Sequence, residues 1–456
     1  MTVRIFNPVS FVLLLLSVVS GCKSTSEPEQ TVRQSGSTIT GRVIDQGSSR
    51  PVAYARVGLN ATARVKFALT GTDGRFAFTG VTPGAYHVSV DRAAYLPLNV
   101  EVPQGVADTS ALTASLQRKS AVPTVKPLSE GIFRINGRHL EEDYNGDHIY
   151  QTMRVKGAAF SPTPIGAYTS GHDAVDRSML YLDTLHANAI RTYSTPDPYL
   201  LTAAANHSMY VIASFWVDAS YDLGNPAARE EIIGNFSSMV KSLKDYPAVL
   251  MWNIGNEQNL PSMNGNNPFW YDLVQELAVT AFEIEGAYYH PVCANNGDFS
   301  NIGDKAKRAD DSSLTYMDLW GCNIYKANLG PSFASYRTRT QKAVVITECG
   351  IDALDNHTKL EYESVQAAVD SMNWSQILSA QDVCVGATFF EFTDEWWKAG
   401  DPAHHDYGGY ATGEHPDGYS NEEWWGLIAV TPDTNGDGYD EWRPRQVFRM
   451  FQRVWQ

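Results

Sequence analysis

Two apolar runs of this sequence end in a carboxylate. The run at 249–254 is followed by a glycine, Asn256 and Glu257, and the run at 344–347 is followed directly by Glu348. A buried strand rarely ends in a charged group that has no partner and no use. Two carboxylates facing each other can break a glycosidic bond, because one attacks the sugar carbon while the other protonates the departing oxygen and later activates water. A retaining enzyme holds the two groups about 5–5.5 Å apart.

The two roles need different surroundings. The acid must keep its proton near neutral pH and so needs apolar or anionic neighbours, whereas the nucleophile needs donors or positive charge. Arg191 lies in the second apolar run and Tyr325 ends the sixth, so both could donate to Glu348. After the eighth run, Glu391 could bind substrate and Trp396 could stack on the apolar face of a sugar ring.

The elements that must position these groups follow one alternating pattern. Short apolar runs alternate with segments of helical periodicity in the second part of the chain, and the eight runs lie at 154–162, 189–194, 210–217, 249–257, 291–298, 319–325, 343–350 and 386–397. Eight such alternations predict a (β/α)8 barrel, an α/β TIM barrel, over residues 149–456. The active groups of such a barrel lie at the C-terminal ends of its strands. A doubly wound open sheet is the alternative, but the glycine-rich phosphate turn that it needs does not follow the first run.

Three of the predicted helices carry recognisable signals. Asn225 and Asn267 each precede a proline, so each is expected to cap a helix whose first residue is that proline. A third helix is predicted around 359–378, with Val365, Val369 and Met372 on its buried face.

The segments Trp252–Glu257 ("WNIGNE") and 345–350 ("VITECG") resemble glycoside hydrolase clan A, and the resemblance spans roughly residues 150–400. It implies that Glu257 is the acid/base, Glu348 the nucleophile and Asn256 the residue that holds the sugar 2-hydroxyl. It also places Arg191 and Tyr325 as the strand-two and strand-six site residues.

Within the clan, "VKGAAFSP", "HANAIRTYSTPDP" and "YVIASFWV" look most like the barrel of β-1,3-glucanosyltransferases, and the family 2 glycosidase barrel is the alternative. The resemblance implies a retaining enzyme that acts on a neutral β-linked polysaccharide, with β-1,3-glucan as first choice. Activity on β-mannan or β-galactosides stays open, as does the choice between hydrolysis and transglycosylation.

Residues 38–118 have a different pattern, with short alternating strands separated by Gly, Asp and Pro. Five strand segments are expected, and they predict a small β-sandwich. "GRVID", "PVAYARV", "TDGRFAF" and "VTPGAYHVSV" resemble the carboxypeptidase regulatory-like domain. The resemblance implies a spacer or a weak binding module without a catalytic group. Residues 119–148 are then a linker with the strands that lead into the barrel.

The N-terminus has the pattern of a bacterial lipoprotein signal. Residues 1–21 contain Arg4 and an apolar stretch too short to span a membrane as a mature helix, and they end before Cys22 in "VSGC", which resembles a lipobox. We expect Cys22 to be acylated and residues 22–37 to be a polar tether. Lys23 after this cysteine suggests the outer membrane by analogy, so we expect a protein of the cell envelope held by its lipid anchor.

Charge and composition narrow the partners and cofactors. The net charge of −16 argues against a nucleic-acid partner and disfavours polyanionic substrates. No organic or redox cofactor is implied. Asp433, Asn435 and Asp437 resemble the first half of a calcium loop, although Pro444 stands at the twelfth position, where an acid is needed. The sequence favours an Asx-rich turn there over a structural Ca²⁺.

Two non-catalytic functions remain open. The protein could be an inactive glycan-binding surface lipoprotein, but the presence of both glutamates argues against this. It could also be an adhesin that binds its partner through the β-sandwich. Four further cysteines lie in apolar runs without metal-ligand spacing and are expected to be buried thiols, with a disulfide as the alternative: Cys293, Cys322, Cys349 and Cys384.

Overall fold

The structure is a computed structural model that describes residues 37–456, apart from positions 54, 61–64, 83, 93–94, 97, 103–108, 119–121, 124 and 144. The predicted signal peptide and Cys22 lie outside the described residues. Among the helices that are described, none combines the length and the apolar character that a membrane crossing requires. The chain forms two compact units, which divide close to residue 118.

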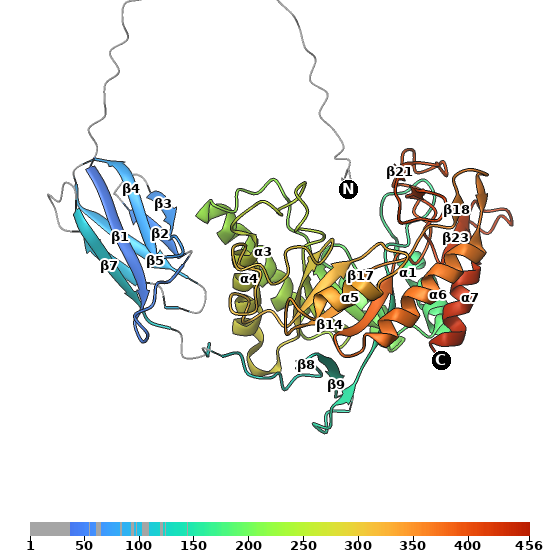
Figure 1. Ribbon diagram of the computed structural model, residues 1–456, viewed down its shortest axis with the longest axis horizontal. Helices are drawn as coiled ribbons and strands as arrows, with labels where there is room; N and C mark the ends of the chain where they lie inside the picture. Colours follow the sequence, from blue (N-terminus) through green and yellow to red (C-terminus); the bar gives the residue numbers. More distant parts are fainter. Residues whose placement is uncertain are drawn as a thin grey trace, which may run out of the picture. The chain divides into compact units, whose positions relative to one another are not determined.

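The N-terminal unit consists of two small antiparallel or mixed sheets (Figure 1). One has the order β4-β1-β7 and the other the order β3-β2-β5-β6. Buried Val, Leu and Phe side chains, such as Val43, Val57 and Phe76, fill its core. Two of its strands were not among the five segments expected from the sequence. The strands are β1 (Ser37–Asp45), β2 (Arg56–Asn60), β3 (Val65–Leu69), β4 (Arg75–Val81), β5 (Tyr86–Asp91), β6 (Leu98–Val102) and β7 (Thr109–Leu116).

The second unit contains a closed barrel of eight parallel strands, which confirms the predicted fold class. Each of the eight apolar runs supplies one strand, and β20 pairs with β11 to close the barrel. The strands are β11 (Val155–Ala159), β12 (Ala189–Arg191), β13 (Tyr210–Phe215), β14 (Val249–Ile254), β15 (Val292–Asn296), β16 (Leu319–Asn323), β17 (Ala343–Glu348) and β20 (Cys384–Phe389).

Helices pack around the outside of the barrel (Figure 1). They are α1 (His172–Leu185), α2 (Pro198–Asn206), α3 (Pro226–Leu243), α4 (Trp270–Glu285), the short η1 (Gly286–Tyr288), α5 (Gly330–Tyr336), α6 (Glu363–Ser379) and α7 (Gln446–Val454). The four cysteines of this unit are free and buried, as expected for core thiols.

The helix signals were right for α3 and partly wrong for α4 and α6. Asn225 caps α3 by accepting the N–H of Ala227 at 2.9 Å. By contrast, α4 begins only at Trp270, because Asn267 accepts the N–H of Phe269 and forms a turn before the helix. In α6, Met372 is 40% exposed, and the buried face carries polar side chains in its place.

Short strands cover both ends of the barrel. At the N-terminal end of the barrel strands, β8 (Phe133–Asn136), β9 (His139–Glu142) and β10 (Gln151–Thr152) form a sheet whose Phe133 and Leu140 pack into the barrel core. At the C-terminal end, short hairpins follow β17 and β20. They are β18 (Leu354–Asp355) with β19 (Leu360–Glu361), β21 (Gly409–Ala411) with β22 (Tyr419–Asn421), and β23 (Ile428–Thr431) with β24 (Glu441–Pro444).

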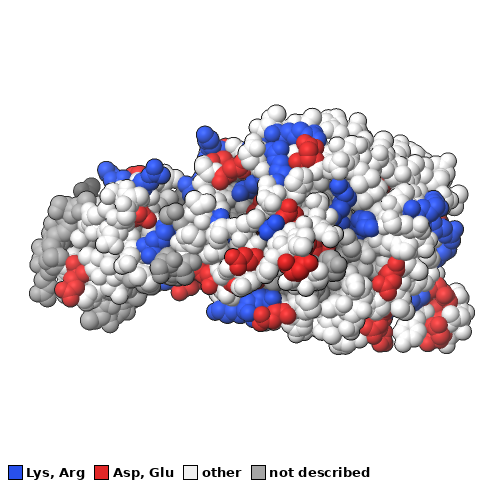
Figure 2. All heavy atoms as spheres, turned by 90° about the horizontal axis from the view of Figure 1, so that it is seen from below, with Lys and Arg blue, Asp and Glu red and all other residues white. Residues whose placement is uncertain are grey.

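Acidic and basic side chains are interspersed over the face shown in Figure 2. They do not gather by sign there, as they would on a surface built to bind a polyanion.

Candidate active site

The turn after β14 places the first predicted acid at the mouth of the barrel. Gly255 has φ 73° and Glu257 has φ 52°, so the chain bends sharply out of the strand. A Cβ at Gly255 would come within 2.5 Å of the Gln258 side chain, which explains the glycine. The N–H of Glu257 donates to Oδ1 of Asn295 at 3.0 Å, and this bond fixes the turn against the next strand. The turn formed by "GNE" therefore brings the partly buried carboxyl group of Glu257 to the end of the strand at the barrel mouth.

The second predicted acid, Glu348, is held from two sides at the end of β17. Nη1 of Arg191 donates to one carboxylate oxygen and the hydroxyl of Tyr325 donates to the other. Arg191 is fully buried and Glu348 is 4% exposed. Burial opposes the charge of Arg191, but the neighbouring Glu348 keeps the pKa of the guanidinium above its usual value. Both oxygens of Glu348 thus accept hydrogen bonds, which fix the orientation of the carboxyl group at the barrel mouth.

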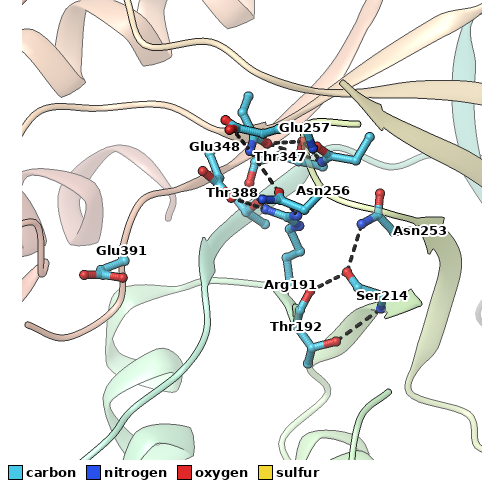
Figure 3. Close-up of polar contacts among 12 residues, drawn as sticks. Arg191, Thr192, Ser214, Asn253, Asn256, Glu257, Thr347, Glu348, Thr388 and Glu391 are labelled. Atoms are coloured by element: carbon cyan, nitrogen blue, oxygen red, sulfur yellow. Dashed lines mark hydrogen bonds and ion pairs between the residues drawn. The ribbon is translucent and has the colours of Figure 1, made fainter. Parts of the chain in front are cut away.

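The side chains of Arg191 and two asparagines connect the two acids through hydrogen bonds (Figure 3 labels Arg191, Asn256 and both glutamates). Nη2 of Arg191 donates to Oδ1 of Asn256 at 2.7 Å. Nδ2 of Asn323 lies 3.1 Å from the same Oδ1 and 3.2 Å from Oε1 of Glu257. Together with Tyr325, six residues therefore belong to one hydrogen-bonded group at the barrel mouth: Arg191, Asn256, Glu257, Asn323, Tyr325 and Glu348.

Asn323 is the residue of this group that the sequence analysis missed. It lies at the end of β16, two residues before Tyr325, and its Oδ1 accepts bonds from Thr347 at 2.8 Å and from Asn295 at 3.3 Å. A polar residue at a predicted strand end, beside a residue already selected, was the signal that could have found it.

The surroundings of Glu257 differ from those of Glu348. Burial raises the pKa of the Glu257 carboxyl to about 7, and the negative charge of Glu348 adds to the rise. The hydrogen bond from Asn323 and the charge of Arg191 oppose it. Near neutral pH, a large fraction of Glu257 therefore carries a proton, which is the condition for a general acid.

Glu391 lies apart from this group in Figure 3. Its Oε2 is 2.5 Å from Nζ of Lys398, which is also 3.2 Å from Oε2 of Glu395. Burial first, and then the charge of Glu395, raise the pKa of Glu391 well above its usual value. Among the described residues, Oε1 of Glu391 and the buried hydroxyl of Tyr193 have no hydrogen-bond partner. The guanidinium of Arg191 lies over the Tyr193 ring, 4.6 Å from its centroid, so Tyr193 borders the group that holds Glu348.

Aromatic rings line the space next to Glu348. Tyr325 packs edge-on against Trp425 at 5.1 Å and against Phe390 at 5.8 Å. Trp396 is only 9% exposed, and its ring stacks on His405 at 4.5 Å. Trp425 thus packs against Tyr325, whereas Trp396 stacks on His405, and a role of Trp396 in sugar binding stays a prediction.

In the candidate calcium loop, backbone N–H groups donate hydrogen bonds to the carboxylate oxygens of the same loop. Asp433 accepts the backbone N–H groups of Asn435, Gly436 and Gly438, and Asp437 accepts that of Tyr439. Within the described part of the chain, no group of three or more His, Cys, Asp or Glu residues has the geometry of a metal site. These backbone hydrogen bonds are those of an Asx turn, and the absence of a bound Ca²⁺ in this loop stays a prediction.

Comparison with known proteins identifies a domain family for the N-terminal unit and solved structures with a similar fold. Residues 38–117 match the model of the carboxypeptidase regulatory-like domain, as the sequence motifs indicated. Among curated proteins, the chain has no match.

Similar solved structures include a GH2 β-galacturonidase from Eisenbergiella tayi bound to galacturonate, at 14% identity and a TM-score of 0.51, with 89% of this chain and 67% of that chain covered. A β-glucuronidase from an uncultured Clostridium sp. is similar at 13% identity and a TM-score of 0.50, with 88% and 63% covered. The likeness is one of fold. This chain therefore shares a barrel architecture with these glycosidases and spans about two thirds of their length.

Proposed function

We propose that the barrel is a retaining β-glycosidase in which Glu348 is the nucleophile and Glu257 the acid/base. The observation that carries the proposal is the contrast between the two acids. Glu348 receives donors on both oxygens, whereas the pKa of Glu257 is raised to about 7 beside it. The fold shared with known glycosidases supports the same reaction class.

The reaction proceeds in two displacements. Glu348 attacks the anomeric carbon while Glu257 gives its proton to the departing oxygen, so a glycosyl ester forms and the glycosidic bond breaks. The ester carries no negative charge, so one cause of the raised pKa of Glu257 is then removed. Glu257 next takes a proton from water or from a sugar hydroxyl, whose oxygen displaces Glu348. The acceptor decides between hydrolysis and transglycosylation.

The charges around the site favour a neutral sugar over a uronide. The ammonium of Lys398 already contacts Oε2 of Glu391 and Oε2 of Glu395. The Arg191 guanidinium is likewise held by Glu348. A substrate carboxylate would therefore meet acidic groups whose cations are already paired, whereas sugar hydroxyls could donate to Glu391. In this respect the proposed substrate differs from the galacturonate bound in the Eisenbergiella tayi enzyme.

Among neutral polymers we propose β-1,3-glucan first, from the resemblance of the first three barrel strands, with β-mannan and β-galactosides as the alternatives. We also propose that Cys22 anchors the protein to the cell envelope through lipid, which the sequence before it supports.

The test is a panel of aryl β-glycosides (glucoside, galactoside, mannoside, glucuronide and galacturonide) together with β-1,3-glucan and β-mannan oligosaccharides. We expect turnover of a neutral glycoside and a first product that keeps the β-anomeric configuration, as followed by NMR. Glu348→Gln should abolish turnover, while Glu231→Gln, on an exposed part of α3, should not change it.

Three results would contradict the proposal. An α-configured first product would exclude the retaining mechanism, and preference for a uronide would overturn the assignment of a neutral substrate. If no member of the panel is cleaved but an oligosaccharide binds, the glycan-binding alternative replaces the enzyme.

A further inference from the structure

A cavity opens at the same end of the barrel as the proposed catalytic acids. It has a volume of about 210 Å³ and is formed by the loop after β17 and by the β21–β22 hairpin segment. The residues used below are Asp352, Leu354, His357, Tyr362, His415 and Asp417. The lining combines an aromatic ring, apolar groups and hydrogen-bonding groups, which is the composition of a small-molecule site.

A buried Asp–His pair lies in the wall of this cavity. Nδ1 of His415 is 2.9 Å from Oδ2 of Asp352, and the two side chains are 4% and 1% exposed. Asp352 also accepts the backbone N–H groups of Leu354 and Asn421, so its oxygens are saturated by protein donors. Because Asp352 engages Nδ1 of His415, the ring nitrogen that a ligand could use is Nε2.

The rim of the cavity carries exposed groups suited to a sugar. Tyr362 is 56% exposed and offers a ring face, and His357 is exposed beside it. Asp417 is fixed by the backbone N–H groups of Asn356 and Tyr419, at 2.7 Å and 3.1 Å. Sugars present an apolar C–H face and a ring of hydroxyls, so an aromatic face beside fixed hydrogen-bonding groups matches their chemistry.

Trp425 links this cavity with the catalytic centre, because its ring packs against His415 and also against Tyr325, the donor to Glu348, with 5.1 Å between the ring centroids in each pair. Burial raises the pKa of Glu422, and the charges of Glu348 and Asp352 both add to the rise. Burial likewise raises the pKa of Tyr410 to about 12, with contributions from Glu422, Glu257 and Asp352. Each residue is therefore within electrostatic reach of the acids on one side and of the Asp–His pair on the other.

We propose that this cavity is a second sugar subsite, which binds a remote residue of the same neutral β-linked oligosaccharide whose bond is cleaved between Glu257 and Glu348. This inference rests on the proposed function, because it assumes that the acids cleave such a chain. It makes the enzyme selective for oligosaccharides over single glycosides, since only a chain can occupy both places.

The experiment compares chain lengths in the wild-type protein and in two rim variants, Tyr362→Ala and His357→Ala. The matched control is Tyr288→Ala, which removes a tyrosine of similar exposure (62%) that precedes β15 at the opposite end of the barrel. The substrates are an aryl monosaccharide and the disaccharide-to-hexasaccharide series of the neutral polymer that the wild type cleaves.

We expect kcat/KM of the wild type to rise with chain length. Tyr362→Ala should lower kcat/KM about tenfold for the long substrates, the effect of losing one aromatic contact, and should change the aryl monosaccharide by less than about twofold. Equal losses on both substrates, or no loss on either, would overturn the subsite while leaving the proposed function intact.

If the wild type cleaves nothing, the proposed function fails and the cavity is tested by binding alone. The hexasaccharides of β-1,3-glucan and β-mannan are then titrated calorimetrically into the wild type, Tyr362→Ala and Tyr288→Ala. Weaker binding by Tyr362→Ala alone supports the subsite, and equal affinities, or no binding by any of them, refute it.

Discussion

The alkaline limb of the pH–activity profile is the sharpest test of Glu257 as the acid. Burial and the charge of Glu348 raise its pKa to about 7, and only the protonated carboxyl can give a proton to the leaving oxygen. We therefore expect kcat/KM to fall as the pH rises through about 7. Asn323 opposes the raised pKa, because its Nδ2 donates to the ionised carboxylate at 3.2 Å. Asn323→Ala should thus move the limb to higher pH.

The size of this movement follows from the hydrogen bond that is lost. A hydrogen bond to a charged group contributes about 1.5–3 kcal/mol, and one pKa unit corresponds to about 1.4 kcal/mol. The contact is at the long end of the hydrogen-bond range and Glu257 is half-buried, so the lower value applies. The limb should therefore move upward by about one pH unit. The movement must be upward, because losing the hydrogen bond from Asn323 to the ionised Glu257 carboxylate favours the protonated form of Glu257.

The assay is kcat/KM for an activated aryl β-glycoside, measured in overlapping buffers between about pH 5 and 10. The control is Thr388→Val, which removes the buried hydroxyl that donates to the Thr347 carbonyl at 2.7 Å without contact to either acid. It should lower the melting temperature without moving the limb. A limb that stays in place in a folded Asn323→Ala protein would refute the assignment, and so would wild-type activity that persists undiminished to pH 9.

Three further predictions test other parts of the structure. Glu257→Ala should slow cleavage of substrates with poor leaving groups about 10²–10⁴-fold but spare a dinitrophenyl glycoside, whose leaving group needs no proton; equal losses in steady-state assays of both would exclude the acid role. Both terminal nitrogens of the buried Arg445 donate to the Asp394 carboxylate, at 2.6 and 2.7 Å, so Asp394→Ala leaves this guanidinium without its bidentate partner. The free energy of unfolding should fall by about 3–5 kcal/mol, and calorimetry should show a melting temperature lower by about 10 °C. An unchanged melting temperature would contradict this prediction. EDTA should leave the melting temperature unchanged, because backbone N–H groups satisfy Asp433; a Ca²⁺-reversible decrease would show that the loop holds a metal.

The barrel and the positions of its acids could be predicted because they depend on local patterns and on one topological rule. Eight apolar runs with helices between them specify the barrel, and closure brings the C-terminal ends of all strands to one mouth. Glu257 and Glu348 are 91 residues apart in the chain, yet their places at strand ends were enough to bring them together. Arg191 and Tyr325 follow from the same rule.

Hydrophobic periodicity predicts neither the contacts of Asn323 nor the ion pair of Glu391, although the place of Asn323 at a strand end beside Tyr325 could have marked it as a candidate. Asn323 lies between Cys322 and Ile324 in an apolar run, so the pattern of hydrophobicity carries no sign of its contacts with neighbouring strands. The partner of Glu391 is Lys398, seven residues further along an irregular loop. No periodicity relates two residues in such a loop, so only the folded path of the chain reveals the pair.

Helix α6 shows the limit of hydrophobic periodicity and also explains how the site is supported. Gln366, Asp370 and Asn373 are fully buried, although the apolar pattern had placed Met372 inside. The pattern fails because this helix packs against irregular backbone as well as apolar side chains. Nε2 of Gln366 lies 3.2 Å from the carbonyl of Trp425 and 3.4 Å from that of Ile351, and buried carbonyls need such donors.

Those two carbonyls belong to the segments that carry the chemistry. Trp425 packs against Tyr325, the donor to Glu348, and Ile351 begins the loop that forms the Asp352 cavity. One buried amide thus ties the wall beside the nucleophile to the wall of the proposed second subsite. Burying a polar side chain is costly unless it makes hydrogen bonds, and Gln366 makes them only through Nε2, since its Oε1 has no partner among the described residues. We therefore expect the bonds of Nε2 to fix the position of the Trp425 wall relative to the Ile351 loop.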